Sequence, residues 1–367
     1  MPSSSTSIVP IAAKAIVSHM QDKNSNSGVE DDHFILKDNI SVSSNQHMML
    51  NDVSNIIGKN PIHSIKHLAE IISSTESTIT FLRSSKLLAT SMTCSKCPGM
   101  ELGERKVDRV SDNVMFFCRK CKKMYSIRSK SFLKNTRCDL RYILKVIYFW
   151  SIGVPSFLVE RMVPEVSDKI VQDWFSFCRD ICIENFKKNP VQFNKGKVRA
   201  ELQIDESLLG KKQKYHKGKI FKRDWLFGIS DPSAHTCHVE LVEKRNRETL
   251  EDIIVRHVDP STEVCIVSDG WAAYSKLQEM GYKHEVVVHE REFKNEDGFH
   301  TNSIESLWSQ IKIWFSSMHG VKKGWYQSYL QEFMYRYNHA GSSRGCCMQK
   351  LFQDIAIFYD VTENHSN

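Results

Sequence analysis

The spacing of apolar and polar residues divides this chain of 367 residues into segments of different character. Residues 1–60 are rich in Ser, Asn and Asp, a composition that predicts a disordered polar N-terminus. Residues 61–90 and 139–186 carry apolar positions at helical spacing. The stretch "NPVQFNKGK" at 189–197 is typical of a linker, and strand-like alternation begins at residue 199.

The alternating region predicts a sheet with helices packed on it. Three strands are expected in hairpin order, at 199–210, 224–231 and 235–244. They are followed by a helix near 247–258, a strand at 263–269, a helix near 271–280 and a strand at 284–289. An amphipathic helix then begins within "FHTNSIESLWSQIK" at 299–312. This order of elements predicts an α/β fold with a mixed sheet.

The last of these helices has a polar face beside its apolar one. Its apolar stripe consists of Ile304, Leu307, Trp308 and Ile311. The adjoining face consists of Asn302, Glu305, Ser309 and Lys312. Asn302 could be an N-cap with Glu305 as its capping-box partner. Alternatively, Glu305 is one member of a metal-binding set, and the helix alone does not decide between the two explanations.

Three candidate helices at 139–153, 155–164 and 167–182 have short connections and resemble a helix-turn-helix layout. Ser167 is a good N-cap for the last of them. The apolar stripe of that helix consists of Ile170, Trp174, Phe177 and Ile181. Lys169, Gln172 and Asp173 could face a DNA groove, although a plain three-helix packing unit would give the same pattern.

Two cysteine pairs have the spacing of a zinc site. Cys94 and Cys97 form one CxxC pair, Cys118 and Cys121 form the other, and twenty residues separate the pairs. This is the usual layout of a tetrahedral four-cysteine Zn²⁺ site, which is structural because four thiolates leave no open position. The other seven of the eleven cysteines are expected to be core or surface thiols.

The net charge of +7 comes entirely from residues beyond 90, because residues 1–90 hold seven Lys/Arg against eight Asp/Glu. Two runs without acidic residues are expected to contact DNA phosphates rather than only face solvent. The first run, 119–137, includes Arg119, Lys120, Lys122, Lys123, Arg128 and Lys130. The second run, 210–223, includes Lys211, Lys212, Lys214, Lys217 and Lys219.

The longest apolar stretch, at 146–159, is too short to span a bilayer, and no signal peptide is convincing. The eleven cysteines of a chain without a signal peptide suggest reduced thiols rather than a disulfide framework. Together these features predict an intracellular protein without a membrane partner. In a host with a nucleus we expect it to be nuclear.

Three carboxylates stand where strands and a helix could bring them together. Asp205 lies within the first strand, Asp269 ends the fourth, and Glu305 lies on the following helix. Such a set can hold two Mg²⁺ or Mn²⁺ ions for phosphodiester chemistry. Simpler explanations exist, because Asp205 could pair with a Lys and Asp269 could cap a helix at Trp271. Three further acids, Glu206, Asp224 and Asp231, are not assigned to this set. Asp224 opens a strand and Asp231 lies in a hairpin turn, so we expect both to face solvent.

Five motifs in order resemble a known family. They are "QIDESLLGKK", "VSDGWAAYSKL", "GYKHEVVVHE", "HTNSIESLWSQIK" and "LQEFMYRYNH". These residues resemble the ISXO2-like transposase domain of bacterial insertion sequences and Merlin-like eukaryotic DNA transposon transposases, over roughly 65–345. The resemblance implies an RNase H-like fold with a DDE triad at Asp205, Asp269 and Glu305, the last two 36 residues apart. It also implies an alternative, since related bacterial members use an Asn and a following Lys, and Asn302 and Lys312 match those positions.

The expected organisation has six segments. They are a disordered N-terminus at 1–60, a helical lead-in at 61–90, a zinc ribbon with its basic run at 91–137, a helix-turn-helix-like domain at 138–188, an RNase H-like DDE domain at 198–345 and a C-terminal tail at 346–367.

The expected function is a metal-dependent DNA transposase that cuts transposon ends and joins them to target DNA. Its partners would be double-stranded DNA, as terminal inverted repeats and as target, and further copies of the chain assembled on that DNA. The alternatives are a domesticated transposase that only binds DNA in a sequence-specific way, and an RNase H-like nuclease that cuts without joining.

Overall fold

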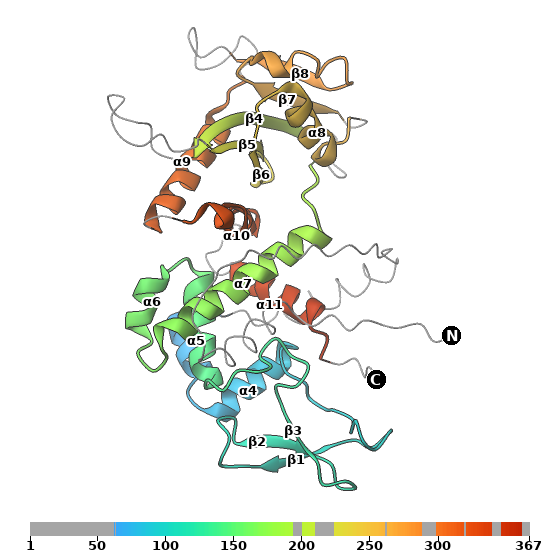
Figure 1. Cartoon of the computed structure of the whole chain (residues 1–367), viewed down its shortest axis with the longest axis vertical. Helices are drawn as coiled ribbons and strands as arrows, with labels where there is room; N and C mark the ends of the chain where they lie inside the picture. The colour runs from blue at the N-terminus through green and yellow to red at the C-terminus, as the bar shows by residue number, and fades with distance from the viewer. Residues whose placement is uncertain are drawn as a thin grey trace, which may run out of the picture. The chain divides into compact units, whose positions relative to one another are not determined.

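The computed structural model describes residues 62, 64–193, 200–209, 224–260, 263–287, 299–318, 321–339 and 346–361. The predicted disordered N-terminus and the second basic run, 210–223, lie outside these residues. The chain divides into two compact units (Figure 1). Unit 1 contains residues 69–141 and the chain beyond 355, and unit 2 contains residues 61–68 and 142–354. None of the described helices is long and apolar enough to cross a membrane.

Unit 1 is built on a small antiparallel sheet. Its strands β1 (Gly103–Lys106), β2 (Val114–Phe117) and β3 (Met124–Ser126) pair in that order. Phe116 and Ile127 are buried in it. The helical lead-in contains α3 (Ile65–Ile71) and α4 (Thr75–Ser84), as the periodicity predicted. Helix α4 begins after Ser74, whose hydroxyl accepts from the Ser77 amide in a capping box.

Unit 2 begins with helices α5 (Leu140–Ser151), α6 (Ser156–Met162) and α7 (Asp168–Lys188). Ser167 caps α7, and Trp174 and Ile181 are buried, as predicted. Helix α10 (Tyr326–His339) packs on α7. Nε of Arg179 lies 3.0 Å from Glu332 in a buried ion pair between these two helices. The segment expected as a tail contains a further helix, α11 (Cys346–Phe358).

The five-stranded sheet of unit 2 is mixed. Its strands are β4 (Ala200–Leu209), β5 (Asp224–Asp231), β6 (Thr236–Val242), β7 (Val264–Ser268) and β8 (Lys283–Val286). Their spatial order is β6-β5-β4-β7-β8, with β6, β5 and β4 antiparallel and β7 and β8 parallel to β4. Three meandering strands followed by two parallel crossovers form the RNase H-like arrangement. The predicted fold class is therefore confirmed.

Helices cover both faces of this sheet (Figure 1). Alternate residues of β5 point to opposite faces, so Phe227 packs with α8 (Arg247–His257) while Leu226 packs with α9 (Asn302–Ser317) and α10. The α8 face is filled by Leu202, Ile204, Phe227, Ile229, Leu250 and Ile254. The α9 face is filled by Leu226, Val239, Ile304, Leu307, Ile311 and Leu330.

Two sequence predictions in this unit are wrong. The segment 271–280 is not an α-helix but a 3₁₀ turn, η1 (Ala272–Tyr274), followed by further turns. The amides of Tyr274 and Leu277 each bond to the carbonyl three residues earlier, and the segment closes at Gly281 with a positive φ of 93°.

The acids that were expected to face solvent do not do so. Asp231 is only 2% exposed, because its carboxylate accepts from the Ser233 hydroxyl at 2.6 Å and the Ala234 amide at 2.9 Å within the β5–β6 turn. Asp224, at the start of β5, is half-buried.

Candidate active site

The parallel pairing of β4 with β7 brings the first two carboxylates into the same region of the sheet. The last pair of this ladder is Gln203 of β4 with Val267 of β7, and Asp205 and Asp269 each lie two residues beyond it. The two carboxylates are close enough for the charge of Asp269 to raise the pKa of Asp205. Asp269 directly follows β7, at the carboxyl end where sites collect in α/β sheets. The Oδ1 atom of Asp269 also accepts from the Trp271 amide at 3.1 Å. This bond is not the expected helix cap, because no α-helix begins there and the N-cap of η1 is Trp271.

The Asp205 carboxylate is held by the indole of Trp308. Nε1 of Trp308, on α9, donates to Oδ2 of Asp205 at 2.8 Å. The indole fits there because the partner of Asp205 on β5 is Gly228. A Cβ atom at position 228 would lie 2.6 Å from Cη2 of Trp308. The missing side chain on β5 thus makes room for the ring that binds the carboxylate on β4.

The start of α9 is fixed by a strand residue that the sequence analysis did not single out. Gln203 is fully buried, and its Oε1 accepts from the amides of Ser303 at 3.0 Å and Ile304 at 3.1 Å. Gln203 and Asp205 are two residues apart on β4, so both side chains face α9. Gln203 is a second polar residue on the strand face that carries Asp205, and this spacing in the sequence could have identified it.

The capping-box explanation of Asn302 and Glu305 is wrong. Helix α9 begins at Asn302, and its N-cap is Thr301, which makes no side-chain cap bond. Glu305 is therefore the fourth helical residue rather than the third. Its Oε1 instead accepts from the Thr301 hydroxyl at 3.3 Å, and its side chain is exposed. Asn302 is also exposed, one turn before Glu305.

The three carboxylates interact electrostatically. Burial raises the pKa of Asp205 to about 6, and the negative charges of Asp269 and Glu305 act in the same direction. The bond from Trp308 opposes this shift, because it stabilises the ionised form. In the described part of the chain, the oxygens of these three groups do not all lie within 4.8 Å of one another. The arrangement is thus an open set of like charges around one strand end.

Glu206, which the sequence analysis set aside, belongs to the surroundings of this site. It points to the opposite face of the sheet from Asp205, where the hydroxyl of Tyr274 donates to its Oε1. Arg245 lies 3.8 Å from its Oε2, and the guanidinium stacks 3.6 Å from the ring centroid of Trp225. Burial raises the pKa of Glu206 to about 7, and the charges of Asp205 and Asp269 add to this effect.

The four predicted zinc ligands converge in unit 1. Cys94 and Cys97 precede β1, whereas Cys118 and Cys121 lie in the turn between β2 and β3. One sulfur atom from each lies within 4.8 Å of the others, and the sulfurs of Cys94 and Cys121 are 3.5 Å apart. Four sulfurs about 2.3 Å from a tetrahedral zinc lie about 3.8 Å from one another. The cluster therefore has the ligand chemistry and the spacing to hold a zinc ion.

The expected DNA-contacting residues fall into three groups. Those that are exposed on unit 1 are Arg119, Lys120, Lys122, Lys123 and Lys130. Those that are exposed on unit 2 are Lys169, Gln172 and Lys312. Those of the second basic run lie outside the described residues: Lys211, Lys212, Lys214, Lys217 and Lys219. The amide of Gln172 donates to Ser156 at 2.8 Å and to Glu160 at 2.7 Å, so it already links α7 to α6.

Arg128 does not belong to the exposed basic surface, and its assignment as a phosphate contact is corrected. It is 3% exposed and forms a bidentate pair with the buried Asp112. Its Nη1 donates to the carbonyl oxygens of Thr136 at 3.0 Å and Cys138 at 2.8 Å, and its Nη2 also donates to the Ser111 hydroxyl at 3.0 Å. Arg128 thus stabilises the fold of unit 1.

The order and direction of the strands of unit 2 define an RNase H-like fold, with Asp205 within the central strand β4 and Asp269 directly after β7. Residues 197–338 match the family model of the ISXO2-like transposase domain. This confirms the resemblance carried by the sequence motifs and supports a transposase. Comparison with curated proteins finds no match.

Several solved structures align with the chain. The crystal structure of the Mos1 strand transfer complex has a TM-score of 0.22 and 11% identity, covering 52% of this chain and 73% of that chain. The pre-cleavage Mos1 transpososome has a TM-score of 0.21 and 11% identity, covering 55% and 73%. The Mos1 transposase paired-end complex with the left transposon end has a TM-score of 0.20 and 12% identity, covering 52% and 74%.

Proposed function

We propose that this protein is a DDE-type DNA transposase that cuts the ends of its own element and joins them to target DNA. The observation that carries the proposal is the parallel pairing of β4 with β7, whose last pair, Gln203 and Val267, lies two residues before Asp205 and Asp269. Helix α9, which presents Glu305, is hydrogen-bonded to the same strand through Gln203 and Trp308. These contacts support a common site for the three carboxylates beside the central strands β4 and β7.

The donor set fits two hard divalent cations such as Mg²⁺ or Mn²⁺. Carboxylate oxygens are the ligands these ions prefer, and the like charges that raise the pKa of Asp205 are those a cation would offset. Asp205, Asp269 and Glu305 would hold the ions, and bound ions supply an activated water and stabilise the leaving oxygen in phosphodiester cleavage. Trp308 and Gln203 orient the carboxylates for this role.

The reaction consists of two in-line displacements at phosphorus. In the first, a water oxygen attacks a phosphodiester at the element's end, and the bond from phosphorus to the 3′ oxygen breaks. The proton lost by the water passes to solvent, and the departing oxygen leaves as a 3′-OH. In the second, the oxygen of that 3′-OH attacks a target phosphodiester and its proton passes to solvent. The bond from phosphorus to the target's own 3′ oxygen breaks, and that oxygen takes up a proton and leaves as a new 3′-OH.

Double-stranded DNA would be bound by the basic surface of unit 1 and by further cations of unit 2. Lys120, Lys122 and Lys123 lie next to the zinc cluster, where a folded ribbon would present them together. Lys169 and Lys312 are exposed on α7 and α9, and the run at 210–223 follows β4 directly in the sequence. Joining two ends to one target requires at least two copies of the chain on the DNA. In a cell with a nucleus this work takes place there.

The test is cleavage of a supercoiled plasmid that carries the repeats flanking the coding sequence, in Mg²⁺. Asp205→Asn, Asp269→Asn and Glu305→Gln should each lower cleavage by about 100-fold or more, because each removes charge that holds a cation. DNA binding, measured separately by gel shift, should stay within a few-fold. Glu279→Gln, an exposed carboxylate of the same unit, is the matched control and should cut normally.

Two further outcomes decide between Glu305 and Asn302 and between activity and mere binding. If Glu305→Gln cuts normally while a folded Asn302→Ala variant is inactive, the third ligand is Asn302. If the wild type binds the repeats but neither cuts nor joins them with Mg²⁺ or Mn²⁺, the chain is a DNA-binding protein and not a transposase. Cleavage without joined products would indicate a nuclease.

A further inference from the structure

A second set of possible metal ligands lies between β6 and α8. His238 and Glu240 alternate along β6 and therefore face the same side of the sheet, on which α8 packs. His257 is the last residue of α8. One ligand atom from each of these three residues lies within 4.8 Å of the others. The imidazole rings of His238 and His257 are stacked, with their centroids 3.7 Å apart.

The hydrogen bonding of His257 leaves one ring nitrogen available as a ligand. Its Nδ1 lies 2.6 Å from the carbonyl oxygen of Val191, which can only accept, so Nδ1 carries the proton. Nε2 then bears a lone pair, and it is buried without a hydrogen-bond partner among the described residues. An imidazole whose Nδ1–H donates to a backbone carbonyl is the usual form of a metal-ligating histidine.

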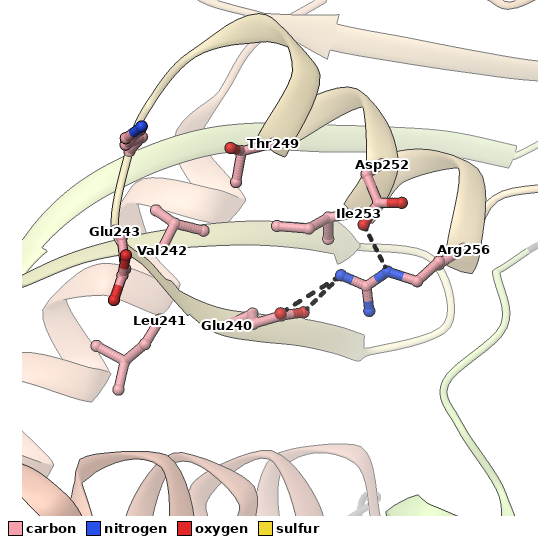
Figure 2. Close-up of a pocket in the computed structure, with 9 residues that line it drawn as sticks. Glu240, Leu241, Val242, Glu243, Thr249, Asp252, Ile253 and Arg256 are labelled. Carbon is pink, nitrogen blue, oxygen red and sulfur yellow. Dashed lines mark hydrogen bonds and ion pairs between the residues drawn. The ribbon is translucent and has the colours of Figure 1, made fainter.

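Glu240 supplies the third oxygen and a route to solvent. Its Oε2 lies 3.4 Å from Nε2 of His238, and its side chain is 30% exposed. Glu240 also lines a cavity of about 360 Å³, together with Thr249, Asp252 and Arg256 (Figure 2). A water molecule from this cavity could complete the coordination of a cation bound to the three side chains.

Arg256 is the competitor for this carboxylate. Its guanidinium lies 3.1 Å from Oε2 of Glu240 and 3.0 Å from Oδ2 of Asp252 (Figure 2). A cation at Glu240 would displace Arg256 from Oε2, but the ion pair with Asp252 would remain available to it. The Arg256 side chain is 45% exposed, so it can move aside without leaving a buried charge unpaired.

We propose that His238, Glu240 and His257 form a binding site for a divalent transition metal of the zinc type. Two imidazoles and one carboxylate, with a water in the fourth position, are ligands that Zn²⁺ accepts in tetrahedral sites. The lone pairs of two stacked imidazoles lie in their ring planes and do not converge on one point. Binding therefore requires the two rings to turn out of their stack, until the ligand atoms lie about 2.0–2.1 Å from the metal. The metal would join the edge strand β6 to the end of α8. This inference stands independently of the proposed transposase activity.

The experiment is a zinc measurement on the full chain. The protein is dialysed against a chelator, reloaded with ZnCl₂, desalted, and its zinc content per chain is measured by mass spectrometry. His257→Gln and Glu240→Gln should each hold about one zinc fewer than the wild type. His235→Asn, which removes an exposed imidazole of the same unit, should hold as much zinc as the wild type.

Arg256→Gln provides a test in the opposite direction. Without the competing guanidinium, a zinc titration should show up to about fivefold tighter binding, because an exposed ion pair can be worth about 1 kcal/mol. Circular dichroism establishes that each variant is folded. If His257→Gln does not fold, Glu240→Gln and Arg256→Gln decide the matter. Equal zinc content in the wild type and Glu240→Gln, or unchanged affinity in Arg256→Gln, would overturn the proposal.

Discussion

The indole N–H of Trp308 donates to the carboxylate of Asp205 at 2.8 Å, across 103 residues of sequence. Trp308 and Glu305 both lie on α9, so this one bond attaches the helix that carries Glu305 to the strand that carries Asp205. The bond also stabilises the ionised form of Asp205, which is the form that binds a cation.

Trp308→Phe should therefore weaken metal binding more than it weakens the fold. We expect a loss of about 1–2 kcal/mol in the free energy of unfolding. The Mg²⁺ concentration for half-maximal plasmid cleavage should rise, because Asp205 loses its donor. Trp325→Phe, at a ring that is 51% exposed, is the control. An unchanged Mg²⁺ midpoint would mean that Trp308 contributes only packing.

Gly228→Ala should destabilise unit 2 by about 1–3 kcal/mol, the usual cost of an overpacked site. The added methyl group would lie 2.6 Å from the Trp308 ring and must displace it. Urea unfolding followed by tryptophan fluorescence measures both the loss and the movement of the ring. Gly324→Ala, where nothing lies within 4 Å, should be close to neutral. Equal stability of the two variants would show that the ring moves at no cost.

Gln203→Leu preserves the volume of the side chain but removes the acceptor for two amides at the start of α9. We expect a loss of about 2–3 kcal/mol, because the amides of Ser303 and Ile304 become unpaired. Hydrogen exchange at these two amides should accelerate, and cleavage should fall with it. Gln310→Leu, on the exposed side of the same helix, should change neither quantity. Unaltered exchange in Gln203→Leu would argue that α9 is held elsewhere.

Removing zinc from the four-cysteine cluster should unfold the small sheet of unit 1. Structural zinc contributes on the order of 10 kcal/mol to the folding of small domains. Cys118→Ser should lower the zinc content by about one ion per chain and abolish exchange protection in β1–β3. Cys138→Ser, in the same unit but outside the cluster, is the control. Persistent protection of β1–β3 in the zinc-free chain would refute the structural role.

Acid should destabilise unit 2 partly through His339. Burial, and the charge of Lys350, lower the pKa of this imidazole to about 4. Below the unfolded value of about 6.5 the unfolded chain binds the proton more readily, so stability is lost as the pH falls from about 6.5 to 4. At pH 5 the loss is about 2 kcal/mol. His339→Gln should lose that much less stability between pH 7 and pH 5 in urea titrations, and parallel curves for the two proteins would contradict the assignment.

The elements were largely predictable from local pattern. Strand β5 begins and ends at the predicted residues, 224 and 231, because a short apolar run and a flanking Asp–Pro turn define it locally. The turns at 271–280 were predicted as an α-helix because Tyr274 and Leu277 are three residues apart, a spacing that also occurs on one face of a helix. Their amides bond to the carbonyls three residues earlier, as in a 3₁₀ turn. The spacing of apolar residues indicates which side chains are buried, but it does not distinguish an α-helix from a 3₁₀ turn.

The candidate site was predictable in its residues but not in its supports. Asp205 and Asp269 could be identified from their strand positions. The roles of Gln203, Gly228 and Trp308 depend on contacts between residues 80 or more positions apart, which no local pattern carries. Arg128 shows the converse, since it sits in a basic run but its partner Asp112 makes it a core residue.

The three carboxylates come from elements that are far apart in the sequence, namely β4, the end of β7 and α9, and this affects the order in which the site can form during synthesis. Synthesis delivers Asp205 first, Asp269 later and Glu305 last, and α9 ends only at Ser317. Domains fold as units during synthesis, so the three carboxylates can meet only after most of the chain has left the ribosome. The segment that carries the four cysteines and β1 to β3 is synthesised long before that point. One part expected to hold DNA is thus made before the part expected to cut it can assemble.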